Sequence, residues 1–288
     1  MVDDKQKANI QRQQRNQYFD RISMDFSDFS FLQNEVATRL FERLEMMNVI
    51  PRRIVEVGCA DGFLTRLLAK KFPKAKIVAL DASSQMIKSA QQKQGFFSPI
   101  KFQQSDPEKL PMKNNSMDLV ISNLAYDYCI EPKKMLLEFN RVLKPGGLLL
   151  LSALGPDSLL ELRQSWLQLN PNASFQTFLD MHIIGDQIQA AQFENTLMDR
   201  DLIQLKYQTL KGLLSELKRA GGQNLHPSRG KGLWGKQIFK EYQKLVEKLR
   251  TDEGHLNVTC ELVFGHGWKN QDVSSADYHT YKVKLDDN

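Results

Sequence analysis

The strongest constraint on the fold is the stretch VEVGCADG, residues 55–62, in which a short apolar run ends in a turn that contains two glycines. Glycine adopts backbone conformations that other residues avoid, and it lets a ligand approach the main chain closely. The helix-forming segment FLTRLLAKKF (63–72) follows directly. In such a strand–turn–helix unit the first N–H groups of the helix point beyond the carboxyl end of the strand. The stretch therefore predicts a nucleotide-type site built around Gly58 and Gly62.

Four further apolar runs follow this turn. KIVALD ends at Asp81, IKFQQSD ends at Asp106, DLVISN ends at Asn123, and LLLLSAL follows the turn RVLKPGG. Strands that alternate with helices form parallel sheets covered on both faces. An acidic side chain at the end of the second strand of such a unit accepts hydrogen bonds from ribose hydroxyls, which is the role we expect for Asp81. We predict an α/β fold, a doubly wound Rossmann-like sheet that binds its ligand at the carboxyl ends of the strands.

The composition indicates a globular chain without covalent cross-links. At 288 residues the chain is long enough for one large domain. The three cysteines, Cys59, Cys129 and Cys260, are an odd number without metal-ligand spacing, so we predict no disulfide framework, no metal site and a reducing compartment. No stretch approaches the roughly 20 apolar residues that span a bilayer, and residues 1–17 do not have the pattern of a signal peptide. These features predict a cytoplasmic protein with no membrane partner.

The chain divides into five predicted parts. Residues 1–17 are polar and predict a disordered tail, whereas residues 18–50 predict a helical lid, with helical spacing of apolar residues from Phe31. Residues 51–155 form the nucleotide-binding core. Residues 156–270 complete the domain, with helices at 157–167 and from about Gly185, and closing antiparallel strands at 202–207 and 258–268. About fifty mostly helical residues lie between these two strands, an insertion suited to substrate selection. Residues 271–288 predict a loosely ordered tail.

Basic residues are concentrated in one segment. Residues 206–250 contain eleven Lys and Arg against three Glu and no Asp. Such a segment is either a solvated face or a docking surface for an acidic partner. It lacks the interleaved aromatic residues of nucleic-acid-binding platforms, so we predict no nucleic-acid partner.

The ordered motifs, from the glycine turn through Asp81 and Asp106 to the PGG turn, resemble those of class I methyltransferases that use S-adenosylmethionine. This resemblance implies that Glu56 and the two glycines border the methionine part of the cofactor, that Asp81 holds the ribose, and that Asp106 meets the adenine edge. The further cofactor contacts that it implies are Cys59, Ala82, Met86, Pro107, Asn123 and Leu124. The family usually has Gly where this chain has Ala60, and an alanine predicts a negative φ there. The turn also lacks the GxGxxG spacing of nicotinamide dehydrogenases.

Other segments resemble the malonyl-[acyl-carrier protein] methyl ester synthases of biotin synthesis. They are FDRxxxxF (19–26), LQNE (32–35), SNLAYDYC (122–129), LGPDSLLELR (154–163), FLDMHIIGD (178–186) and ELVFGHGW (261–268). The resemblance covers most of the chain and implies a carboxylate O-methyltransferase whose partner is malonyl-loaded acyl-carrier protein, with segment 206–250 as its dock. Two sites depart from the family pattern. Phe26 replaces a lid tyrosine, and Asp127 and Tyr128 replace a Gln-Trp pair.

The implied chemistry requires orientation rather than a general base, because a carboxyl group with a pKa near ~4 is already ionised at neutral pH. A cation must hold the carboxylate, and water must be excluded. Arg163 is the predicted anchor, with an ion pair to Glu161 or Asp157 as the alternative. For the other substrate candidates the alternative is a purely structural role, in the core or in an amphipathic cap. These candidates are Phe19, Phe26, Tyr126, Tyr128 and His182.

Two other functions stay open at this point. One is another methyltransferase on the same core, which includes the methyltransferase-fold assembly factors of respiratory complex I. The other is a cofactor-binding scaffold without activity. The assembly-factor group generally lacks the Met181–His182 pair and the GHGW ending that this chain has, which favours the malonyl substrate. The oligomeric state does not follow from the sequence.

Overall fold

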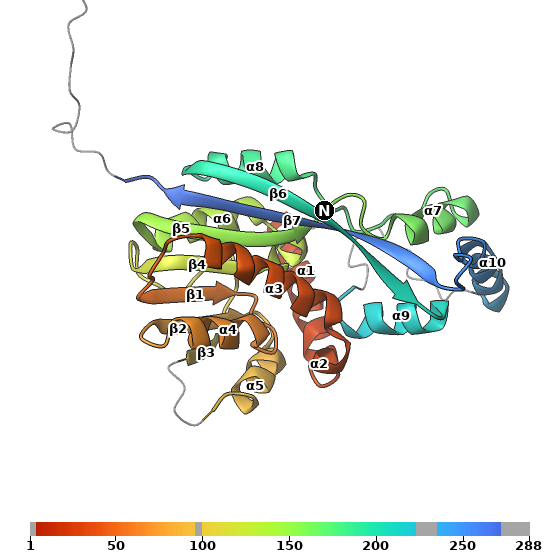
Figure 1. Cartoon of the computed structure of the whole chain (residues 1–288), viewed down its shortest axis with the longest axis horizontal. Helices are drawn as coiled ribbons and strands as arrows, with labels where there is room; N and C mark the ends of the chain where they lie inside the picture. Colours follow the sequence, from red (N-terminus) through yellow and green to blue (C-terminus); the bar gives the residue numbers. More distant parts are fainter. Residues whose placement is uncertain (1–3, 96–99, 223–234, 272–288) are drawn as a thin grey trace, which may run out of the picture.

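A computed structural model describes residues 4–95, 100–222 and 235–271. A seven-stranded sheet with the order β3-β2-β1-β4-β5-β7-β6 forms its centre (Figure 1). The strands are β1 (Arg53–Val57), β2 (Lys76–Asp81), β3 (Ile100–Gln104), β4 (Met117–Asn123), β5 (Leu143–Leu154), β6 (Phe193–Tyr207) and β7 (Leu256–Lys269). The first five are parallel, and β7 runs antiparallel to both β5 and β6. The predicted parallel sheet with closing antiparallel strands is confirmed.

Two hydrophobic cores cover the opposite faces of this sheet, because side chains alternate along each strand. Ile54 and Leu148 pack into one core together with α3 (Phe31–Met46), α4 (Phe63–Lys71) and α5 (Ser84–Gln92). Their neighbours Val55 and Leu149 pack into the other core with α6 (Pro132–Val142) and α8 (Met181–Ala190). The central strands are therefore apolar on both faces. Packing on both sides holds the carboxyl ends of β1, β2 and β4 in place at one edge of the sheet.

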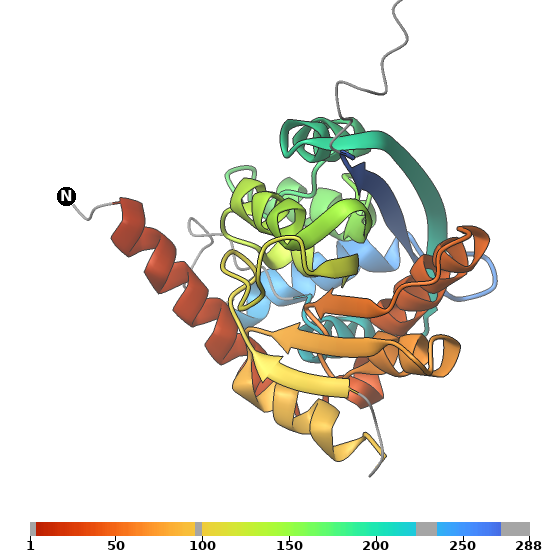
Figure 2. The same cartoon turned by 90° about the vertical axis from the view of Figure 1, so that its left-hand side faces the viewer.

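The amino-terminal segment differs from the prediction. Residues 4–17, predicted to be a disordered tail, belong to α1 (Asp4–Ile22). Charged contacts, which the low apolar content of the segment does not reveal, hold this helix. Its Arg12 forms ion pairs with three carboxylates, those of Asp106, Glu108 and Glu131. Figure 2 shows that α1 lies across the carboxyl ends of the parallel strands, so it covers the edge where a ligand is expected.

The short helices α2 (Phe26–Phe29) and η1 (Ala125–Tyr128) lie beside the same edge. The predicted strand at 202–207 is the last part of β6, which begins at Phe193. The first part of this strand is half-exposed and contains many polar residues, so its sequence lacks a clear strand pattern. The predicted insertion between β6 and β7 contains α9 (Leu210–Arg219) and α10 (Lys236–Glu247). These helices and α7 (Leu160–Leu169) share a small apolar cluster with the ends of β6 and β7.

The predicted carboxyl-terminal tail, except for Gln271, lies outside the described residues. Within the part of the chain that the structure describes, no helix has both the length and the hydropathy needed to span a bilayer.

Candidate cofactor and substrate site

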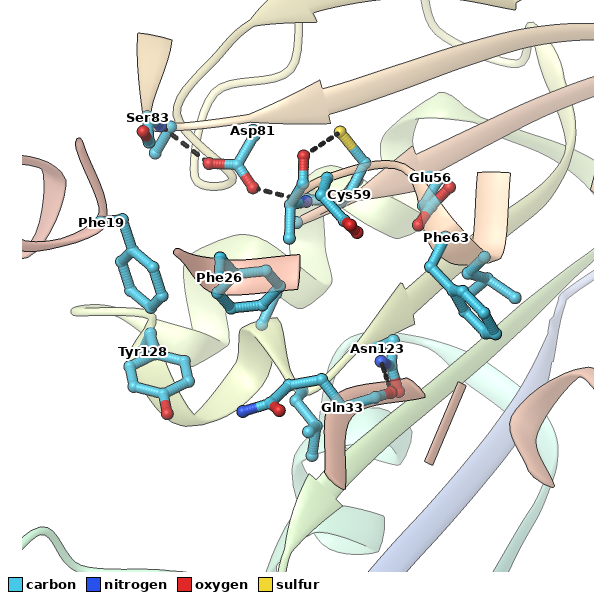
Figure 3. Close-up of a pocket in the computed structure, with 18 of the residues that line it drawn as sticks. Phe19, Phe26, Gln33, Glu56, Cys59, Phe63, Asp81, Ser83, Asn123 and Tyr128 are labelled. Atoms are coloured by element: carbon cyan, nitrogen blue, oxygen red, sulfur yellow. Dashed lines mark hydrogen bonds between the residues drawn. The ribbon is translucent and has the colours of Figure 1, made fainter. Parts of the chain in front are cut away.

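A cavity of about 900 Å³, open solvent at its mouth included, lies at the carboxyl ends of β1, β2 and β4. Residues from α1, α2, α3 and the turn after β1 line it, and Figure 3 shows several of their side chains pointing inward. The sequence-predicted residues that line it are Phe19, Phe26, Glu56, Gly58, Cys59, Asp81, Ala82, Pro107, Asn123, Leu124 and Tyr128. The structure thus brings together eleven of the seventeen predicted site residues, because most of them stand at strand ends.

The glycine turn after β1 is shaped by close backbone contacts. The N–H groups of Gly58 and Cys59 both donate to the carbonyl oxygen of Leu80, over 2.8 and 2.9 Å. Gly58 has a φ of +81°, and a Cβ placed on it would lie 2.4 Å from the Cβ of Ala125. No side chain fits there without displacing the segment after β4. Gly62, also at positive φ, begins α4 behind the cavity wall and does not line it.

Ala60 has a left-handed backbone conformation, which corrects the prediction of a negative φ. Its φ is +45°, and its N–H donates to Oδ2 of Asp81 over 2.9 Å. For a residue with a Cβ this conformation costs about 1–2 kcal/mol. The turn therefore keeps the shape that a glycine would give it, and the Asp81 hydrogen bond helps to hold that shape.

Asp81 presents a carboxylate to the cavity from the end of β2. Oδ2 accepts the Ala60 N–H, and Oδ1 accepts the Ser83 N–H over 2.8 Å. Burial raises the pKa of Asp81, and these two hydrogen bonds oppose that shift. A carboxylate has about four acceptor positions, so about two are left for a ligand. This capacity suits the vicinal hydroxyls of a ribose.

Glu56 is an acid of the cavity whose pKa is strongly raised. It lies in the buried part of β1, one residue before the end of the strand, is 1% exposed, and accepts a hydrogen bond from the Thr65 hydroxyl. Burial is the main cause that raises its pKa to about 8, and the neighbouring carboxylates Asp61 and Asp81 add to the shift. A buried carboxyl group with this pKa is poised to ionise when a cation arrives beside it. A ligand ammonium group would be such a cation.

Two other predicted cofactor residues do not line the cavity. Asp106 lies 3.5 Å from the Nε of Arg12, and its Oδ1 accepts the Glu108 N–H, so α1 engages its carboxylate. Met86 is fully buried under the lid, where it packs with Phe26 and its neighbours on α1. Both residues thus contact α1, Asp106 through Arg12 and Met86 through Tyr18 and Ile22.

The aromatic candidates fall into two groups. Phe19 and Tyr128 line the cavity with their rings edge to face and their centroids 5.1 Å apart, and Phe26 lines it beside them. The Tyr128 hydroxyl donates to the carbonyl oxygen of Gly221 over 2.8 Å. Tyr126, in contrast, is buried in the core on the other side of η1 and donates to Gln187 over 2.7 Å. For Tyr126 the structure therefore favours the alternative, core packing.

Arg163 and His182 lie away from the cavity. The Arg163 guanidinium on α7 donates to the carbonyl oxygen of Pro156, and its buried Nε has no hydrogen-bond partner among the described residues. Neither of its predicted ion-pair alternatives forms within the described part of the chain. The His182 side chain is 79% exposed and pairs with Asp180 on the surface of α8, because the apolar side of that helix faces inward at Ile184. The expectation that His182 is buried is wrong, and His182 does not line the cavity.

Sequence reasoning missed the polar residues that two helices contribute. Arg15 and Asn16 reach the cavity from α1, and Gln33 and Asn34 reach it from α3. One feature of the sequence could have identified Arg15, namely its spacing of three and seven residues from Tyr18 and Ile22. This spacing places the three side chains on one face of a helix, and all three are buried.

Comparison with known proteins identifies the class of this fold. Residues 55–151 match the family model described as a methyltransferase domain. Among solved structures, the YcgJ protein of Bacillus subtilis has a TM-score of 0.57 at 17% identity, covering 81% of this chain and 98% of that chain. A Haemonchus contortus phosphoethanolamine N-methyltransferase 2 has a TM-score of 0.52 at 18% identity, covering 81% and 53%. The fold and the site define a class I, Rossmann-like methyltransferase.

Two relatives narrow the class further. The malonyl-[acyl-carrier protein] O-methyltransferase of Legionella pneumophila is 36% identical over 251 residues, which are 87% of this chain and 88% of the relative. The protein of the same description from Gallionella capsiferriformans is 35% identical over 289 residues, 96% of this chain and 98% of the relative. The chain belongs to the malonyl-[acyl-carrier protein] O-methyltransferase family.

Proposed function

We propose that this chain transfers the methyl group of S-adenosylmethionine to the free carboxylate of malonyl-[acyl-carrier protein], and that the methyl ester enters biotin precursor synthesis. Support comes from one observation above the others. A cavity with the features of a cofactor site lies in a chain that aligns over nearly its whole length with methyltransferases of this description. The alignment extends beyond the cofactor motifs to the lid and to the helices between β6 and β7.

The residues of the cavity fit this cofactor. The contact that a Cβ on Gly58 would make with Ala125 shows that the turn has no room for a side chain, as expected where a ligand meets the backbone. Asp81 would accept the ribose hydroxyls, and Glu56 would pair with the ammonium of the methionine part. The bound cofactor supplies a methyl group activated by a sulfonium.

The protein orients the reacting groups and excludes water from them. The malonyl carboxylate is ionised at neutral pH and attacks without a general base. One of its oxygens would take the methyl group, the bound cofactor would leave as S-adenosylhomocysteine, and no proton would be transferred. Phe19, Phe26 and Tyr128 form an apolar wall that keeps water from the carboxylate and so favours the attack. Phe26 supplies this wall without the hydroxyl group of the family's tyrosine.

The activity is tested by mass spectrometry of the carrier. Purified protein is incubated with methyl-labelled S-adenosylmethionine and either malonyl-carrier or acetyl-carrier protein. The malonyl carrier should gain the mass of one methyl group, and the acetyl carrier should gain none. No gain on the malonyl carrier, in a protein that still binds S-adenosylhomocysteine by calorimetry, would refute the proposal. That result would favour a scaffold or another acceptor.

We further propose that the carrier docks on the basic segment 206–250, of which residues 223–234 lie outside the described residues. The end of α9 adjoins the cavity. The Tyr18 hydroxyl donates to the Lys218 carbonyl oxygen over 2.9 Å, and Ala220 lines the cavity. Exposed lysines continue this basic surface along both helices, at Lys211, Lys218, Lys236, Lys240, Lys244 and Lys248. A carrier bound to this surface would place its acyl arm at the cavity.

Charge reversal tests the dock. Lys218→Glu with Arg219→Glu should raise the KM for malonyl-carrier protein about tenfold and raise the KM for malonyl-coenzyme A less, because the acidic surface of a carrier covers more of the basic segment than the phosphates of coenzyme A do. The matched control is Lys74→Glu with Lys113→Glu. These two exposed lysines precede β2 and β4, so they lie at the amino ends of these strands, whereas the cavity lies at their carboxyl ends. Equal losses with both substrates, or the same loss in the control, would exclude docking at the end of α9.

A further inference from the structure

Arg15 carries the only positive side chain among the described residues that line the cavity. The other ionisable groups of its wall are the carboxyls of Glu56, Asp61 and Asp81, the thiol of Cys59 and the phenol of Tyr128. Asp61 is already paired with Lys93, at 2.7 Å. The cavity therefore has one cation without an ion-pair partner among the described residues, on the helix that closes it. Its charge does act on Asp81, where it opposes the rise in pKa that burial causes.

The guanidinium of Arg15 is buried and only partly satisfied. The residue is 5% exposed. Its Nε donates to Asn16 over 3.0 Å, and its Nη1 donates to the carbonyl oxygen of Tyr128 over 3.4 Å. Its Nη2 is buried without a hydrogen-bond partner, and no carboxylate among the described residues forms an ion pair with it. A buried positive charge in this state destabilises the protein unless an anion pairs with it. A carboxylate is such an anion, because its two oxygens can accept two parallel hydrogen bonds from a guanidinium.

We infer that Arg15 binds the carboxylate of the acyl substrate and holds it for methyl transfer. The inference rests on the proposed function, which supplies two carboxylates, one on the malonyl group and one on the methionine part of the cofactor. The cofactor's carboxylate shares a carbon with the ammonium that Glu56 would hold. Figure 3 shows Glu56 and Tyr128 at opposite ends of the cavity, and Arg15 contacts Tyr128. The position of Arg15 therefore favours the malonyl carboxylate.

The role differs from that of a general acid or base. Arg15 moves no proton, and its charge neutralises the malonyl carboxylate only in part, so that an oxygen lone pair stays available for attack. Asn16 and the Tyr128 carbonyl fix two edges of the guanidinium, which leaves the Nη2 edge for the ligand. Held in this way, the carboxylate would lie between the aromatic wall and the cofactor.

The inference is tested on a complex that undergoes no turnover. Protein loaded with S-adenosylhomocysteine is titrated with malonyl-carrier and with acetyl-carrier protein, which lacks the carboxylate. Wild type should bind the malonyl carrier about 10- to 100-fold more tightly, as expected for a charge-assisted contact to a buried arginine. Arg15→Gln should lose this preference by weakening malonyl binding alone, and Arg15→Lys should keep part of it. The matched control, Arg21→Gln, changes an exposed arginine of the same helix and should keep all of it.

Each contrary outcome has a different meaning. If Arg15→Gln keeps the preference for malonyl-carrier protein, or if Arg163→Gln alone abolishes it, the inference is overturned and the proposed function stands. If Arg15→Gln instead weakens binding of S-adenosylhomocysteine about tenfold, Arg15 holds the cofactor's carboxylate and the assignment to the substrate is wrong. If wild type shows no preference for the malonyl carrier, the proposed function fails together with the inference. Circular dichroism of each variant establishes that it is folded.

Discussion

Replacing Glu56 with glutamine should stabilise the protein without cofactor and weaken its binding of cofactor. The Glu56 side chain is buried, and that burial is the main cause that raises its pKa from 4.5 to about 8. A glutamine has nearly the same shape, and its amide oxygen still accepts the Thr65 hydroxyl bond. It has no charge to bury, so the cost of ionising this position in the folded state disappears.

The sign follows from the two pKa values. Between pH 4.5 and about 8, the folded protein keeps a proton on Glu56 that the unfolded chain releases. The stabilising contribution of this proton is complete below the unfolded pKa and is lost as the pH rises through the folded pKa. At about 1.4 kcal/mol per pH unit, raising the pH from about 4.5 to about 7 lowers the wild-type free energy of unfolding by about 3 kcal/mol through this group. The glutamine variant has no such loss.

Urea denaturation of both proteins without cofactor, at about pH 5, 6 and 7, measures the effect. The advantage of Glu56→Gln in free energy of unfolding should grow by roughly 1 kcal/mol per pH unit. Calorimetry with S-adenosylhomocysteine, in buffers of different ionisation enthalpy, should show wild type releasing up to one proton and the variant releasing none while binding about tenfold or more weakly. A stability difference that stays constant across this range would mean that Glu56 is already ionised in the folded protein, and would refute the reasoning.

Three further predictions concern other single residues. Ala60→Gly should raise the free energy of unfolding by about 1 kcal/mol in urea denaturation, because it relieves a left-handed φ of +45°, and an unchanged value would contradict the strain. Burial raises the pKa of Asp127 to about 8, so Asp127→Asn, whose amide oxygen still accepts the Leu154 N–H, should gain stability over wild type as the pH rises from about 5 to about 7. A pH-independent difference would exclude this account of Asp127. Gly58→Ala should weaken S-adenosylhomocysteine binding at least about a hundredfold in calorimetry, since the new methyl group meets Ala125 at a positive φ. Wild-type affinity would exclude the turn from the cofactor site.

The sheet and the cofactor side of the cavity could be predicted because their determinants are local. Gly58 and Asp81 each stand directly after an apolar run, and the end of a strand is a position that neighbouring residues define. Parallel strands bring such positions to one edge of the sheet whatever the rest of the chain does. The positive φ of Ala60 was harder to predict from the sequence, because it depends on how the whole turn packs against Asp81.

The substrate side could not be predicted to the same depth, because it depends on which way a short element turns. Tyr126 and Tyr128 lie two residues apart in η1, yet one hydroxyl reaches α8 and the other reaches the segment after α9. Nothing in SNLAYDYC distinguishes these two directions. His182 has apolar neighbours in the sequence, but Asp180 caps the start of α8, and His182 then lies on the exposed side of the helix. In both cases long-range packing decides which side of an element faces the cavity.

The wrong prediction for residues 4–17 and the unpartnered guanidinium on the same helix have one physical cause. A helix that packs on an apolar core shows an apolar stripe, and this stripe is what sequence patterns detect. The inner face of residues 4–17 of α1 instead meets the carboxyl ends of strands, where acidic side chains and a polar cavity lie, so arginines occupy it. Arg12 finds protein carboxylates there, whereas Arg15 finds none among the described residues. A helix of this kind has the polar composition of a disordered tail, because the surface that it packs against is charged. At Arg15, the proposed partner is not a protein residue but the carboxylate of a ligand.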